Sequence, residues 1–227
     1  MSFSETLSRR ARARGISIHH TQMVDLERHF QLLGRWNESA QLTSLSPDEI
    51  IDRHFLESLE ALRFLPEHSV RMVDVGTGNG FPALPLLMLR RNLEGYLLEP
   101  STRKRAFLKE VIRETSLAGR VHVLPDRIDR PEDLVPLAPF HLLTMRAVAG
   151  IEVILSGAAR SMEPGGKAIL FVGRSALESL QEECPTGLTL SHYTELTGRT
   201  ASYIAVIERI SSSQPANPPA PGSPPNQ

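Results

Sequence analysis

Residues 72–82 read Met-Val-Asp-Val-Gly-Thr-Gly-Asn-Gly-Phe-Pro, an apolar run followed by glycine at every second position and then proline. The run is apolar on both of its faces, as in a strand that is buried on both sides of a parallel sheet. Pro82 suits the first turn of a helix, where a backbone N–H has no partner within the helix. The stretch therefore predicts a strand, a tight turn and a helix.

The glycines of this turn indicate a ligand. Gly76, Gly78 and Gly80 permit positive φ and let the backbone approach a bound molecule. They do not meet the dinucleotide fingerprint Gly-x-Gly-x-x-Gly, because Phe81 stands where its third glycine belongs. Asp74 instead precedes the first glycine by two residues. A carboxylate here repels phosphate and attracts an amino group or a positive centre, and S-adenosylmethionine carries both.

A second acid ends the next strand-like run. Glu99 lies 23 residues after Gly76. In dinucleotide-binding folds a carboxylate about 20 residues further on, on the neighbouring strand, binds ribose hydroxyls. We therefore predict that the turn and Glu99 bind S-adenosylmethionine; the alternative is a plain surface loop.

Composition bounds the class of protein. With 227 residues, 41% hydrophobic and 22% charged, the chain suits one sizeable core plus an appendage. Its apolar runs are shorter than the roughly 20 residues that span a bilayer, so we expect a cytoplasmic protein without a membrane segment. One cysteine and scattered histidines predict no disulfide and no metal site. A net charge of −1 leaves nucleic-acid binding to local basic clusters.

We expect three parts along the chain. Residues 1–65 form an N-terminal helical extension, with one amphipathic helix over 21–36 and a second that opens at Ser46-Pro47-Asp48-Glu49. The second helix carries His54, for which a structural hydrogen bond is the alternative to a functional role. Before them, the arginines of residues 9–14 either contact phosphates or lie on a solvated terminus.

Residues 66–210 alternate strand and helix, which predicts an α/β fold with a mostly parallel sheet and helices on both faces. The expected strands are 70–75, 95–99, 121–124, 140–145 and 167–172, with helices at 82–91, 102–116 and 150–162. A hairpin of 188–193 and 201–207 closes one edge and brings the sheet to seven strands. Residues 211–227 are rich in proline and serine and lack charged or aromatic side chains, so we expect a disordered tail.

Several motifs in order resemble the RsmG (GidB) methyltransferases of small-subunit ribosomal RNA. Trp36-Asn37 with Leu42-Thr43 resembles that family's Trp-Asn-x-x-x-Asn-Leu-Thr, and residues 53–59 resemble its Arg-His-x-x-Asp-Ser-Leu helix. Residues 73–82 are close to its cofactor loop, and residues 97–108 resemble its Leu-Leu-Asp-x-x-x-Lys-Arg-x-x-Phe-Leu. Met145-Arg146-Ala147 stands where the family has Ser-Arg-Ala. The likeness covers residues 36–207.

The chain departs from the family pattern at several positions. Gln41, Ala83 and Glu99 replace an asparagine, a glycine and an aspartate. Val172 stands where the family carries a lysine, and Arg174 follows two residues later.

The resemblance implies a class I S-adenosylmethionine-dependent methyltransferase (Rossmann-like) fold and N7-methylation of a guanine in 16S rRNA. The expected partners are 16S rRNA or the small ribosomal subunit, and we expect a monomer. Guanine N7 carries a lone pair and no proton, so no general base is needed and the site chiefly positions the reactants. The residues expected at the cofactor are Asp74, Gly76, Thr77, Gly78, Gly80, Phe81, Glu99, Arg127, Ile128 and Arg146.

Arg146 is also the catalytic candidate, expected to hold the target base or a phosphate, with a structural ion pair as the alternative. Further RNA contacts are expected from residues 9–14 and from Arg103, Lys104, Arg105 and Lys109. Three other functions stay open: methylation of a small molecule, a catalytically silent ribosome-binding module, and a nicotinamide dehydrogenase, which Phe81 disfavours.

Overall fold

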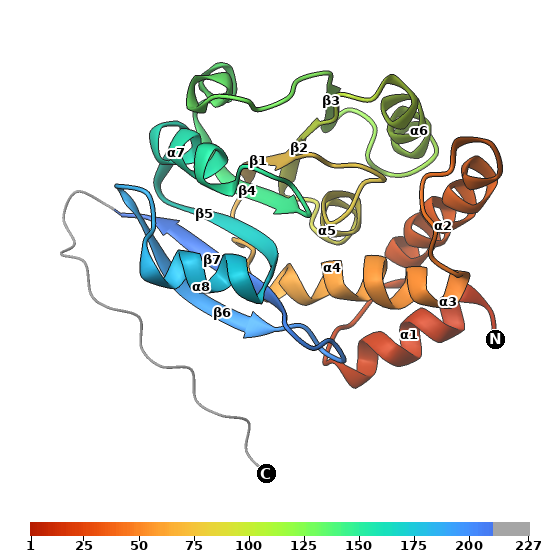
Figure 1. The fold of residues 1–227 in the computed structure, drawn as a ribbon. Coiled ribbons are helices and arrows are strands. Elements are labelled where there is room, and N and C mark those ends of the chain that lie inside the picture. The colour runs from red at the N-terminus through yellow and green to blue at the C-terminus, as the bar shows by residue number, and fades with distance from the viewer. Residues whose placement is uncertain (211–227) are drawn as a thin grey trace, which may run out of the picture. The chain divides into compact units, whose positions relative to one another are not determined.

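The computed structural model describes residues 1–210 (Figure 1). These residues fall into two compact units. The N-terminal unit ends at Arg127 and the C-terminal unit begins at Ile128. The expected tail, residues 211–227, lies outside the described residues, and the expected division at residues 65 and 66 stays a prediction. Within residues 1–210, no helix is both long enough and apolar enough to cross a membrane.

Two helices of the N-terminal unit have a serine as their N-cap. Ser2 and Glu5 form a capping box at α1 (Phe3–Ala13), and Ser46 and Glu49 form the expected one at α3 (Pro47–Ile50). Such reciprocal bonds satisfy backbone N–H groups that have no partner inside the helix. Between them lies α2 (His20–Ala40), and α3 continues directly into η1 (Ile51–Leu56), α4 (Glu57–Glu60) and η2 (Ala61–Phe64).

One expectation about these helices needs correction. The sequence pattern predicts one regular helix after Ser46, whereas η1 is a stretch of π-helix. The apolar spacing of residues 50–62 does not distinguish the two, because a brief widening of the helix leaves the buried residues on one face. Arg9, Arg10 and Arg12 lie on a regular helix, α1, and Arg14 directly follows its last residue.

Three parallel strands follow in the order β3-β2-β1. β1 (Val70–Val75) pairs with β2 (Leu93–Leu98), and β2 pairs with β3 (Val121–Leu124). Helix α5 (Ala83–Leu89) follows the glycine-rich turn and is buried at every residue, while α6 (Thr102–Arg113) packs against β3. The strand, turn and helix expected over residues 72–91 are therefore confirmed.

The C-terminal unit contains four strands in the order β4-β5-β7-β6. β4 (Phe140–Arg146) is parallel to β5 (Met162–Gly173), and the expected hairpin of β6 (Leu188–Glu195) and β7 (Ser202–Arg209) adds to β5 in antiparallel pairing. Its helices are η3 (Pro131–Leu137), α7 (Ile151–Ser161) and α8 (Arg174–Glu182). Of these, η3 and α8 were not among the expected elements.

Strand β5 begins five residues earlier than expected. Met162 pairs with Phe140 and Lys167 pairs with Leu142, so residues 163–166 form a bulge inside the strand. A Cβ at Gly166 would lie 2.8 Å from the Glu163 carbonyl oxygen and 2.9 Å from that of His141. The Pro-Gly-Gly signal therefore marks this bulge, because only a glycine tolerates such close backbone contacts.

Candidate active site

The glycine-rich turn begins where β1 ends. The backbone N–H groups of Gly76 and Thr77 both donate to the Leu98 carbonyl, at 3.0 and 3.1 Å, which ties the turn to β2. Gly76, Gly78 and Gly80 have φ values of +69°, +57° and +89°. The predicted positive φ is confirmed at all three glycines.

Two of these glycines meet different surroundings. A Cβ at Gly80 would collide with the Leu84 side chain, so this glycine lets the turn pack on α5. A Cβ at Gly78 would have one described neighbour within 4 Å, the Gly76 carbonyl oxygen at 3.8 Å. Within the described residues, Gly78 therefore borders open space that a ligand can occupy.

Both predicted acids are buried against the turn. Asp74 is 0% exposed and accepts a hydrogen bond from the Thr77 hydroxyl. Glu99 is 4% exposed and accepts from Gly78 N at 2.9 Å and from Ser101 N at 2.8 Å. A carboxylate has about four acceptor positions, so Glu99 can receive ligand hydroxyls as well. The sequence predicts a ligand-binding role for these acids, and the structure adds that they brace the turn.

An aromatic stack supports the far end of the turn. Phe81 lies between two histidine rings, with centroids 4.7 Å from His29 and 4.5 Å from His54. His29 is 0% exposed, and its Nε2 lies 3.0 Å from the Asn79 carbonyl oxygen, to which it donates. Burial lowers the pKa of His29 to about 3, so its ring is neutral at physiological pH. Phe81 thus belongs to the packed wall beneath the turn.

Sequence reasoning missed His29. Its signal is position, because it follows Leu26 by three residues and precedes Leu33 by four on the apolar face of α2. A histidine on such a face must bury its ring and find a partner for its N–H. The partner is a carbonyl 50 residues away, which the sequence pattern does not identify.

The remaining predicted site residues lie at strand ends. Arg127 is exposed and follows β3 by three residues, on the side of the sheet where Glu99 follows β2. Ile128 is half-buried and opens the C-terminal unit. Arg146 is the last residue of β4, as expected, and its guanidinium carbon lies 5.6 Å from the centre of the Phe171 ring.

The structure divides the predicted RNA-contacting residues into bonded and exposed cations, apart from Lys104, which is half-buried. Arg10 bonds Asp48 and Asp52, both at 2.8 Å, and Arg14 lies 3.2 Å from Glu60. Arg105 donates to the Glu99 and Pro100 carbonyls at 3.0 and 2.5 Å. These three residues hold the fold together. The exposed cations of the set are Arg9, Arg12, Arg103 and Lys109.

Val172, the residue that stands where the family carries a lysine, is buried. Val172 is 9% exposed in β5 and pairs with Tyr203 of β7. Arg174, two residues later, is exposed at the start of α8. An exposed cation is therefore present close to this position in the chain.

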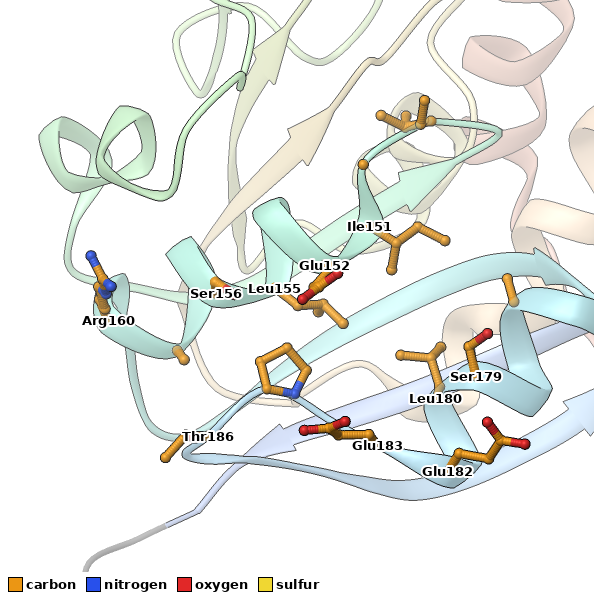
Figure 2. A pocket seen from close by; sticks show the side chains of 16 residues that line it. Ile151, Glu152, Leu155, Ser156, Arg160, Ser179, Leu180, Glu182, Glu183 and Thr186 are labelled. Atoms are coloured by element: carbon orange, nitrogen blue, oxygen red, sulfur yellow. The ribbon is translucent and has the colours of Figure 1, made fainter.

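The C-terminal unit has a separate cavity of about 1100 Å³ between α7 and α8 (Figure 2). Leu155 and Leu180 lie in it, and Glu152, Glu182 and Glu183 also line it (Figure 2). Arg160 at its edge bonds Glu132 at 3.0 Å. Three carboxylates repel a polyanion, so this face does not suit RNA.

Comparison with known proteins identifies the family. The sequence model of the family rRNA small subunit methyltransferase G (GidB) matches residues 22–197. The chain belongs to this family. It is 32% identical to ribosomal RNA small subunit methyltransferase G of Desulfitobacterium hafniense, over 97% of this chain and 95% of that protein. It is 37% identical to the protein of the same name from Acidiphilium cryptum, over 66% of this chain and 68% of that one.

Solved structures share the fold of this family member. TrmN from Thermus thermophilus matches with a TM-score of 0.55 and 22% identity, over 78% of this chain and 52% of that one. A putative rRNA-methylase from Clostridium thermocellum matches with a TM-score of 0.53 and 15% identity, over 67% and 93%. These likenesses confirm the expected fold, a Rossmann-like methyltransferase with seven strands that are mostly parallel. The chain is accordingly a methyltransferase, and its fold implies a methyl donor.

Proposed function

We propose that the protein uses S-adenosylmethionine to methylate N7 of a guanine in 16S rRNA of the small ribosomal subunit. The observation that carries this proposal is the turn at Gly78, braced by buried Asp74 and Glu99, in a member of the rRNA small subunit methyltransferase G family. Relatives over almost the whole chain are named for small-subunit ribosomal RNA.

The residues of the turn fit the proposed cofactor. Gly78 borders open space, and Glu99 beside it offers acceptors to ribose hydroxyls. Asp74 attracts the amino group or the positive centre of the ligand. When bound, S-adenosylmethionine supplies a methyl group carried on a positively charged sulfur. We assign the cofactor to Asp74, Gly76, Thr77, Gly78, Gly80, Phe81 and Glu99, with Arg127, Ile128 and Arg146 as further candidates.

The protein's own task is then to position the base and to exclude water. Guanine N7 carries a lone pair and no proton, so its reaction needs no residue that removes a proton. His29 supports this reading, because a buried neutral ring that donates to Asn79 serves to hold the turn rather than to transfer protons. We assign Arg146 to the RNA, through a phosphate or a base edge.

Exposed cations supply the remaining RNA contacts. Arg9 and Arg12 lie three residues apart on α1 and line a cavity of about 500 Å³, to which α1 also contributes Glu5, Ser8 and Ala13. Arg103 and Lys109 are exposed on α6. With a net charge of −1, the chain depends on such local clusters to bind a polyanion.

The test is mass mapping of 16S rRNA from cells that lack the protein and from cells complemented with the wild type or with Gly78→Val. We expect one 7-methylguanosine to vanish on deletion and to return with the wild type alone. Unchanged rRNA would contradict the proposal and favour a small-molecule substrate or a silent ribosome-binding module. Calorimetric titration with S-adenosylmethionine then separates these two, since a silent module need not bind it.

A further inference from the structure

The cavity between α7 and α8 has no role in the proposed reaction (Figure 2). Both helices belong to the C-terminal unit, and both pack against β5. The cavity holds about 1100 Å³, which exceeds the roughly 300 to 1,000 Å³ of typical sites for small organic molecules. It therefore has room for several side chains of a partner. We call it the α7–α8 groove.

Apolar side chains at helical spacing line both walls of the groove. On α7, Ile151, Leu155 and Ala159 recur every four residues, which places them in one row along the helix. This row runs for about 12 Å, since a helix rises about 1.5 Å per residue. Ala176 and Leu180 have the same spacing on α8. The groove therefore has an apolar strip on each of its two walls.

Part of this apolar lining is open to a partner. Leu155 and Leu180 are 0% and 6% exposed and form the floor of the groove. Ile151, Ala159 and Ala176 are half-buried, so they present apolar surface to water. A partner side chain that enters the groove covers this surface, which favours binding.

Carboxylates of both helices border the apolar strips. Glu152 of α7 and Glu182 and Glu183 at the end of α8 line the groove and are exposed (Figure 2). Within the described part of the chain, none of these three acids forms an ion pair. Arg160 also lines the groove, but its charge is paired with Glu132. The lining therefore carries unpaired negative charge.

The end of α8 adds to this negative charge. The helix ends at Glu182, and its last turn contains no basic residue. The last carbonyl groups of a helix carry a partial negative charge, which attracts cations and repels carboxylates such as Glu182 and Glu183. A cation supplied by a partner would relieve this repulsion.

The two units differ in charge in the same sense. Residues 1–127 contain 18 of the chain's 25 Lys and Arg and 16 of its 26 Asp and Glu. The remaining residues, 128–227, therefore carry seven Lys and Arg and ten Asp and Glu. The exposed cations that we assign to RNA lie in the N-terminal unit, whereas the acidic C-terminal unit suits a basic partner.

We propose that the α7–α8 groove binds a basic amphipathic helix of another protein. Its apolar side chains lie on the two strips, and its Lys or Arg side chains lie beside Glu152, Glu182 and Glu183. Recognition of a helix in a groove uses apolar anchors three and four residues apart, which match the rows of α7 and α8. This proposal goes beyond the proposed function and does not depend on it.

Two other classes of partner fit the groove less well. RNA is repelled by the unpaired carboxylates. A small organic cation such as spermidine can neutralise these acids, but it leaves the half-buried Ile151 and Ala176 in contact with water. Only a segment that is both basic and apolar complements the whole lining.

The probe is a synthetic peptide of leucine and lysine, with its leucines at helical spacing, and fluorescence anisotropy measures its binding to the full-length protein. Ala176→Trp fills the groove from α8. Ser175→Trp is the matched control, because Ser175 is the exposed neighbour of Ala176 outside the lining. We expect peptide affinity to fall at least tenfold in Ala176→Trp and less than twofold in Ser175→Trp. Both melting temperatures should match the wild type.

A second variant tests the charge and keeps the proposal testable if Ala176→Trp does not fold. The double variant Glu182→Gln and Glu183→Gln removes two charges and keeps the size of both side chains. Its affinity for the peptide should fall at least threefold at low salt, where exposed charges are least screened. A second peptide, with serine in place of every leucine, should bind the wild type at least tenfold more weakly.

Several results would overturn the proposal. No binding of the leucine peptide by the wild type, or equal binding by folded Ala176→Trp and Ser175→Trp, would remove the groove as its site. Equal binding of the serine peptide would mean that charge alone attracts the probe. Displacement of the leucine peptide by an equal concentration of spermidine would assign the groove to a small organic cation. A dimer in analytical ultracentrifugation that Ala176→Trp dissociates would assign it to a second copy of the chain.

These measurements are independent of the proposed function. Peptide binding is observed directly, and no methyl group is transferred in the assay. A protein that leaves 16S rRNA unmodified but binds the leucine peptide in the groove would contradict the proposed function and support this proposal.

Discussion

At the residue scale, one glycine of the turn is required by the fold and another faces open space. Gly80 packs against Leu84, so a side chain there disturbs the core. Gly78 combines a φ of +57° with space on its Cβ side. The same sequence spacing therefore contains a structural glycine and a candidate ligand-contacting glycine.

Gly78→Val should abolish cofactor binding, because its Cβ branches occupy the space that we assign to the ligand. Gly119→Val is the control, since Gly119 also has positive φ, +84°, and open space around it. Both variants strain the backbone, and we expect Gly78→Val alone to lose at least tenfold in affinity, about 1.4 kcal/mol. Calorimetric titration beside circular dichroism measures this. Affinity within about twofold of the wild type, roughly 0.4 kcal/mol, would place the cofactor elsewhere.

Arg146→Lys separates charge from geometry, because lysine keeps the charge and loses the planar fork. We expect methyl transfer to fall tenfold or more, about 1.4 kcal/mol, with the S-adenosylmethionine affinity unchanged. Arg160→Lys is the control, since Arg160 pairs with Glu132 at the surface. The readouts are single-turnover transfer, cofactor titration and thermal melting. Lower stability with normal turnover would make Arg146 a structural residue, and selective loss of cofactor binding would assign it to the cofactor.

His29 should make stability depend on pH. Burial, with a smaller contribution from His54 across Phe81, lowers its pKa from the usual 6.5 to about 3. Between these two values the unfolded chain binds a proton that the folded chain does not, so stability is lost as the pH falls from 6.5 toward 3. The contribution is about 2 kcal/mol between pH 7.5 and pH 5.

Urea unfolding at pH 7.5, 6 and 5 measures this dependence in the wild type and in His29→Gln, whose amide can still donate to Asn79. The variant should lose about 2 kcal/mol less than the wild type over this range. Equal pH dependence in the two proteins would exclude His29 as its source.

At the element scale, α1 uses its arginines in two ways. Arg10 and Arg14 form ion pairs with acids of residues 48–60, and Arg9 and Arg12 are exposed. The helix is thereby held in place by one pair of cations and presents the other pair to solvent. The high density of arginine in residues 9–14 conceals this division, because the pattern records charge and not the partner.

The double variant Arg9→Gln and Arg12→Gln should bind small subunits more weakly without loss of stability. Each lost phosphate contact lowers the slope of log K against log salt by about one, so we expect a reduction of about two. Arg10→Gln is the control, expected to lower stability and leave the slope unchanged. Filter binding at several salt concentrations measures the slope, and an unchanged slope in the double variant would remove α1 from the RNA-binding surface.

At the scale of the whole molecule, the methyltransferase fold lies within the described residues, and the proline-rich segment 211–227 follows them. We expect truncation after Ile210 to leave the melting temperature and methyl transfer unchanged, because that composition cannot bury apolar surface. Differential scanning calorimetry and the transfer assay on both forms test this. A fall of more than about 3 °C, roughly 1 kcal/mol for a chain of this size, would mean that the segment stabilises the fold.

Most of the fold could be predicted because its signals are local. The apolar run before Gly76, the capping box at Ser46 and the β-prone runs of the final hairpin each involve neighbours within a few residues. The family followed from such motifs in order, and the comparisons confirm it. The π-helix at 51–56 and the bulge at 163–166 were missed, because hydrogen-bond register within a helix or sheet leaves little trace in hydrophobic periodicity.

By itself the sequence determined the fold class, the family and the candidate residues of the turn. The tertiary structure alone decided which partners those residues have. His29 meets Asn79 across 50 residues, and Asn79 meets Leu42 across 37. Such contacts depend on which surfaces the core brings together, and burial then decides which polar groups must pair. A cavity beside the turn arises in this way, because residues 41–45, His54 and Asn79 line it together only after the helices pack.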